Sequence, residues 1–163
     1  MDPKISRIAS KIIESTDVSE GALSVPDGQV IAHLSHFISA KYSVEIAYRN
    51  FSDRIKGLWR DSLVEHWHKH AQDERQSTYD LSMKLIGLGG DPVLTMIQIP
   101  VCTSNVIGFH QILMKMELEA IEAGRTLIQM AGQNTGLKVL AENTVLLDSH
   151  HLDDLKRMGS YLA

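Results

Sequence analysis

The chain of 163 residues has one cysteine, Cys102, so it can form no internal disulfide and no cysteine-rich zinc or iron–sulfur module. Positive charge is not in excess either: 16 Lys and Arg against 20 Asp and Glu give a net charge of −4, which argues against general binding to nucleic-acid phosphates. No apolar run approaches the roughly 18 residues of a membrane span, and residues 1–20 lack the basic-then-apolar layout of a secretory signal. We therefore expect a cytoplasmic protein that binds neither membrane nor nucleic acid.

Proline is also scarce, and its four positions leave two long proline-free stretches, 27–91 and 101–163. Apolar residues recur in both at steps of three and four, which is the period of a helix and not of a strand. Glycine-containing breaks at 56–57 and 132–136 divide each stretch into two helices joined by a short turn. We predict an all-α fold, an antiparallel four-helix bundle over residues 29–163, with one long crossover between the second and third helices. Residues 1–28 are predicted to form an N-terminal extension with a short amphipathic helix that carries Ile5, Ile8, Ile12 and Ile13.

Polar residues interrupt the apolar stripes near the middle of the predicted helices. They are Lys41, Glu45, His70, Glu74, Ser77, Glu117, Asp148 and His151. Each one alone is more simply explained as a side chain at the edge of its stripe that reaches water. In an antiparallel hairpin, however, the numbers of level residues have a nearly constant sum, which predicts three pairs: Lys41 with Glu74, Glu45 with His70, and Glu117 with His151. We therefore predict a polar layer across the interior of the bundle, with Asp148 one turn from its last pair.

The predicted layer carries unbalanced charge. Four carboxylates against one ammonium leave a formal charge of −3 if both histidines are neutral. Burying an unpaired carboxylate costs several kcal/mol, a large share of the roughly 5 to 15 kcal/mol that stabilises a domain. A divalent cation, protonated carboxyls, charged histidines or incomplete burial would each relieve this cost. Carboxylates with one or two imidazoles from facing helices suit iron, manganese or zinc.

Two related patterns occur in the chain. Lys41 in the first corresponds to Glu117 in the second, 76 residues later, and Glu74 corresponds to Asp148, 74 residues later. The first reads Lys41-x-x-Val44-x-x-x-Tyr48 and then Glu74-x-x-Ser77, and the second reads Glu117-x-x-Ala120-x-x-x-Gly124 and then Asp148-x-x-His151. From Leu34 to Leu162 the chain resembles the ferritin-like superfamily, of the bacterioferritin and mini-ferritin (Dps-like) type. In that family, Glu-x-x-Ala-x-x-x-Tyr on one helix and Glu-x-x-His on the next recur in the same way.

The resemblance implies that Glu74 and Asp148 bridge two irons and that Glu117 and His151 are terminal ligands of one of them. The corresponding ligands of the other iron are replaced by Lys41 and Ser77, a cation and a poor ligand. Three alternatives stay open. They are a mononuclear centre of Glu74, Glu117, Asp148 and His151, a displaced dinuclear centre that also uses Glu45 and His70, and a metal-free bundle. Haem is not expected, because bacterioferritins bind it through a methionine after the second-helix glutamate, and Arg75 stands there in this chain.

For function, the resemblance implies iron binding, with iron oxidation as a ferroxidase or iron storage. The alternative is a structural or interaction protein that keeps the bundle and has lost its metal site. The resemblance also implies self-association. The twelve residues after His151 are too few to finish the fourth helix and add the fifth helix of 24-subunit ferritins, so if the protein forms a closed cage, a 12-subunit cage is favoured. His66 and His70 are four apart and could chelate a surface ion, although this spacing also arises by chance.

Overall fold

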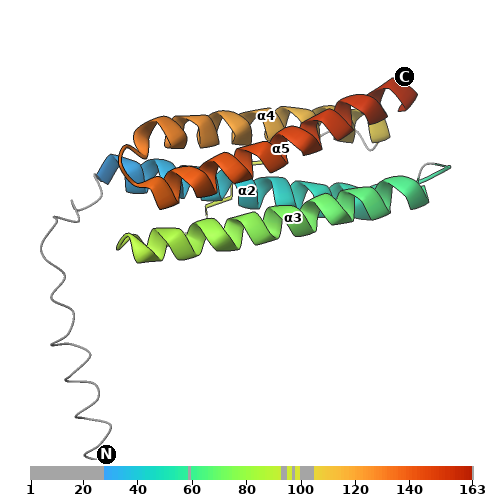
Figure 1. Cartoon of the computed structure of the whole chain (residues 1–163). Helices are drawn as coiled ribbons and strands as arrows, with labels where there is room; N and C mark the ends of the chain where they lie inside the picture. Colours follow the sequence, from blue (N-terminus) through green and yellow to red (C-terminus); the bar gives the residue numbers. More distant parts are fainter. Residues whose placement is uncertain (1–27, 59, 93–94, 97, 100–104, 163) are drawn as a thin grey trace, which may run out of the picture.

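The structure, a computed structural model, describes residues 28–58, 60–92, 95–96, 98–99 and 105–162. Within these residues it has four long α-helices and no strand: α2 (Gly28–Arg54), α3 (Arg60–Gly87), α4 (Val106–Met130) and α5 (Thr135–Leu162). α2 packs along α3 and α4, and α4 packs along α5 (Figure 1). The predicted four-helix bundle is confirmed. The helix predicted around Ile5 to Ile13 lies outside the described residues.

The two helical hairpins form because each short turn has residues suited to ending one helix and starting the next. Gly57, between α2 and α3, and Gly132, between α4 and α5, have φ values of 92° and 53°, which favour glycine. Asn134 caps α5, since its side-chain oxygen accepts a hydrogen bond from the backbone N–H of Leu137 at 3.0 Å. The end of α3 and the start of α4 lie at opposite ends of the bundle, as a long crossover requires (Figure 1).

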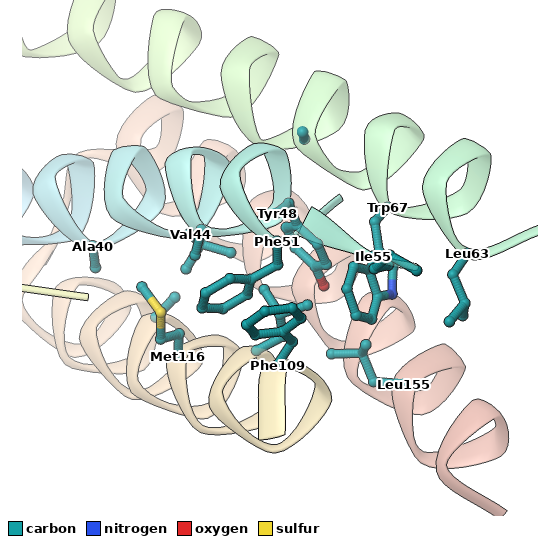
Figure 2. Close-up of a cluster of buried hydrophobic side chains, with 14 residues drawn as sticks. Ala40, Val44, Tyr48, Phe51, Ile55, Leu63, Trp67, Phe109, Met116 and Leu155 are labelled. Atoms are coloured by element: carbon teal, nitrogen blue, oxygen red, sulfur yellow. The ribbon is translucent and has the colours of Figure 1, made fainter. Parts of the chain in front are cut away.

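Two apolar clusters fill the interior of the bundle. In one, the rings of Phe51 and Phe109 stack 4.6 Å apart between α2 and α4, with Trp67 of α3 nearby (Figure 2). The other cluster lies toward the opposite end and includes Leu34, Phe37 and the leucines of α3 and α5 that face them. Along α3 and α5, buried polar residues separate the two clusters. This is the position at which the sequence predicts a polar layer.

We find no helix among the described residues that is long and apolar enough to cross a lipid bilayer.

Candidate metal centre

The polar layer is buried at the centre of the bundle, and all four helices contribute to it. Lys41 of α2, Glu74 of α3, Glu117 of α4 and Asp148 of α5 are each 0% exposed, and His151 of α5 is 3% exposed. The simpler explanation, that these side chains reach water from the edges of their stripes, is therefore wrong for these five residues. Charge that is buried this deeply must be compensated within the layer.

Lys41 compensates two of the three carboxylates. Its Nζ lies 2.6 Å from Oε2 of Glu74 and forms a second ion pair with Oδ1 of Asp148. Burial alone would lower the pKa of Lys41, but the nearby charges of Glu74, Asp148 and Glu117 outweigh it and raise the pKa above its usual value. Lys41 is therefore an ammonium ion held between the two carboxylates to which the resemblance gives the bridging role.

His151 faces the remaining oxygens of the layer. Its Nδ1 lies 3.0 Å from Oε1 of Glu74 and 3.4 Å from Oε1 of Glu117, while its Nε2 lies 3.4 Å from Oδ2 of Asp73. Burial alone would lower the pKa of His151, but hydrogen bonds with Glu117 and Glu74 raise it to about 10. Without a metal, His151 is therefore a second buried cation.

Tyr48 and His70 lie along one side of this cluster. The hydroxyl of Tyr48 donates a hydrogen bond to Oε1 of Glu117 at 2.7 Å, and Nδ1 of His70 lies 3.1 Å from the same hydroxyl. The rings of His70 and His151 stack with centroids 4.0 Å apart. Burial lowers the pKa of His70 to about 3, with a further contribution from the charge of His151. Sequence reasoning found Tyr48 as part of a pattern but gave it no role at the site, where it orients Glu117.

Glu45 lies apart from the cluster. It is buried, but its Oε1 accepts a hydrogen bond from Nε of Arg75 at 3.0 Å, forms an ion pair with Nη2 of Arg75 at 3.0 Å, and lies 3.5 Å from Nη1 of Arg49. The structure thus pairs Glu45 with Arg75, and not with His70 as the register predicts. Removing Glu45 from the count leaves three carboxylates against Lys41, a formal charge of −2, or −1 when His151 is protonated.

Four of the predicted ligands meet at one point. Glu74, Glu117, Asp148 and His151 each offer a ligand atom within 4.8 Å of the others. Within the described part of the chain, Oε2 of Glu117 and Oδ2 of Asp148 are buried without a hydrogen-bond partner. Such orphaned carboxylate oxygens are unfavourable unless a cation or donor satisfies them. Three carboxylates and one imidazole form a donor set that fits iron, manganese or zinc.

Ser77 also lies on α3, one turn beyond Glu74, and is 8% exposed. Its hydroxyl is a poor metal ligand, unlike a carboxylate or an imidazole. The half of the layer that contains Lys41 and Ser77 therefore differs in chemistry from the half that contains Glu117 and His151.

Comparisons with known proteins agree with the fold. A family model described as a ferritin-like domain matches residues 31–158. No curated protein matches the chain significantly. A solved structure described as "ferritin like, diiron-carboxylate proteins", from Bacillus anthracis str. Ames, matches with a TM-score of 0.77 and 22% sequence identity, over 80% of this chain and 95% of that chain. At this identity the structural match shows a common fold.

Proposed function

Because this chain belongs to the family of ferritin-like domains, we propose that it is a metal-binding protein that holds a single transition-metal ion inside its bundle. The proposed ligands are Glu74, Glu117, Asp148 and His151. Iron is the ion that the family favours, and the donor set also fits manganese and zinc.

The observation that carries this proposal is how Glu74 and Asp148 divide their oxygens. One oxygen of each carboxylate pairs with the ammonium of Lys41. The other oxygen of Glu74 faces His151, and the other oxygen of Asp148 has no hydrogen-bond partner among the described residues. Each carboxylate thus uses one oxygen for the ammonium of Lys41, and its other oxygen would be available to a metal ion held with Glu117 and His151.

Lys41 also disfavours a second ion. A unit charge and a divalent ion about 4 Å apart repel each other by about 8 kcal/mol at an effective dielectric constant of about 20. A second metal ion would therefore have to displace the ammonium or bind beside it against this repulsion. Since Lys41 is buried and its pKa is raised, it does not lose its proton easily.

Neighbouring residues orient two of the proposed ligands, Glu117 and His151. Tyr48 holds Glu117 in place through its hydrogen bond, and Asp73 lies near Nε2 of His151, which fixes the orientation of the imidazole. His151 must release a proton before its Nδ1 can bind a metal, so binding is coupled to proton loss.

When bound, iron would supply one-electron redox chemistry. With one ion per chain, only one electron is available in each bundle, so we expect slow iron oxidation compared with a two-iron ferroxidase.

A second candidate function is supported by the same layer. Lys41 and a protonated His151 together reduce its formal charge to −1 without any metal. In this case the protein is a structural or interaction protein whose two buried cations have replaced the metal pair of the family.

Metal content distinguishes the two candidates. We expect the chain, loaded with Fe(II) without oxygen and then desalted, to retain one ion that the double variant Glu117→Gln, His151→Gln loses. The matched control is Glu119→Gln, His150→Gln, which makes the same changes at exposed neighbouring positions. Equal iron content in the double variant and the unmodified protein, or no iron in the unmodified protein, would refute the single-ion proposal, and absence of iron would favour the structural one.

A further inference from the structure

A second group of ligand-type side chains lies outside the buried centre. His66 and His70 occupy successive turns of α3, and Asp154 of α5 lies against them. Oδ2 of Asp154 is 3.6 Å from Nε2 of His70 and 3.7 Å from Nε2 of His66. The rings of His66 and His70 have centroids 4.4 Å apart. The side chains of His66 and Asp154 are 33% and 29% exposed, so solvent reaches the edge of this group.

The hydrogen bonds of His70 determine which of its nitrogens carries the proton. Tyr48 has a single hydroxyl proton, and it donates that proton to the carboxylate of Glu117. The hydroxyl oxygen of Tyr48 must then accept from Nδ1–H of His70. In the neutral ring this leaves a lone pair on Nε2, and that lone pair faces a carboxylate oxygen of Asp154.

His66 adds a further unsatisfied atom. Its Nε2 is buried and has no hydrogen-bond partner within the part of the chain that the structure describes. The distance of 3.7 Å to Asp154 is too long for a hydrogen bond. The lone pair on Nε2 of His70, the unpartnered Nε2 of His66 and a carboxylate oxygen of Asp154 thus converge on one point, which a cation would satisfy.

We propose that His66, His70 and Asp154 form a second metal site, which takes a borderline divalent ion such as Zn²⁺, Co²⁺ or Fe²⁺. Two ligands bound at roughly 2.1 Å to a tetrahedral ion lie about 3.4 Å apart. The observed separations of 3.6 and 3.7 Å are within a few tenths of an ångström of this value. Three protein ligands at a partly exposed edge leave at least one coordination position for water.

The charges around the group agree with this assignment. Burial lowers the pKa of His66, which favours the neutral ring that a metal requires. Burial alone would raise the pKa of Asp154, but its hydrogen bond with Arg157 outweighs it and lowers the pKa, so the carboxylate is ionised. Arg157 pairs with Oδ1 of Asp154, which leaves Oδ2 directed at the two histidines.

The second site shares no ligand with Glu74, Glu117, Asp148 and His151. The two sites can therefore be removed by different substitutions, and the variants used to test the second site leave His70 in place because its ring stacks on His151. His66→Gln and Asp154→Asn each remove one ligand of the second site. His68→Gln and Asp153→Asn are matched controls, because they make the same changes at neighbouring positions that are more exposed.

The test is zinc binding to the full chain, without a histidine tag and after treatment with a chelator. Zn²⁺ is titrated in competition with a chromophoric chelator, and Co²⁺ absorption bands report the ligand set. We expect His66→Gln and Asp154→Asn each to weaken one zinc site by at least about 100-fold, more than the loss of an outer hydrogen-bond partner does. The two controls should bind as the unmodified protein does, and thermal unfolding checks that every variant is folded.

The outcomes separate the two sites. If Glu117→Gln removes one zinc ion and His66→Gln and Asp154→Asn remove none, the second site is wrong and the buried one stands. If the reverse holds, the second site stands and the buried one falls. Unchanged zinc affinity and Co²⁺ bands in both His66→Gln and Asp154→Asn would overturn this inference directly.

Discussion

Replacement of Lys41 by methionine tests whether its ammonium neutralises the buried layer. Methionine has a similar length and no charge, so Lys41→Met leaves Glu74 and Asp148 buried without their ammonium partner and creates little cavity. Removing one partner of a buried ion pair typically destabilises a protein by about 3 to 5 kcal/mol. In a domain of this size, that corresponds to a fall in Tm of about 6 to 20 °C.

The assay is urea or thermal unfolding followed by circular dichroism, with a chelator present. Lys115→Met is the matched control, because Lys115 is 70% exposed and its ion pair with Glu119 lies on the surface, so its loss should change stability by less than about 1 kcal/mol. Divalent metal should restore part of the stability of Lys41→Met, about 2.7 kcal/mol at 100 times the Kd. If Lys41→Met is as stable as Lys115→Met both with and without metal, the ammonium of Lys41 does not take the place of a metal ion in the layer.

The same layer gives two further predictions, and the family resemblance gives a third. Lys41→Glu with Ser77→His rebuilds both family patterns, so metal content should rise toward two ions per chain and Fe(II) oxidation should accelerate; no gain in metal would contradict the interpretation of Lys41. Because the pKa of His151 is about 10 in the folded chain and about 6.5 when unfolded, its protonation stabilises the chelator-treated protein fully below pH 6.5, and this stability is lost as pH rises through 10. Unfolding measured across this range should show a loss that His151→Gln lacks, and equal pH profiles would count against a charged His151. If the chain assembles into a closed cage, light scattering should give 12 subunits, whereas 24 would contradict this expectation and a dimer would favour the structural function.

The spacing of the sequence was sufficient to predict the bundle and two of its internal contacts. Lys41 meets Glu74, and Glu117 meets His151, because short turns fix the register of each helical hairpin. Register alone does not determine which neighbour the side chain of a level residue points toward. Glu45 is one turn beyond Lys41 and is rotated toward Arg75, whose guanidinium satisfies it more completely than a neutral imidazole can.

Contacts between the two hairpins could not be predicted in the same way. The pairing of Asp148 with Lys41 and of Asp154 with His70 depends on how one hairpin sits on the other, which no turn length fixes. Asp154 follows His151 by three residues, so it lies on a similar face of α5, but nothing in the sequence places that face against His66. Burial of Lys41 likewise depends on this packing of all four helices.

The central claim, one buried metal position beside a buried ammonium, is tested most directly by counting tightly held iron in the His66→Gln variant. In this variant the second site is disabled, so only the buried centre contributes. Mass spectrometry after anaerobic loading and desalting should find one iron per chain, and addition of Glu117→Gln and His151→Gln should reduce it to none. Two irons per chain in the His66→Gln variant, or none, would contradict the account.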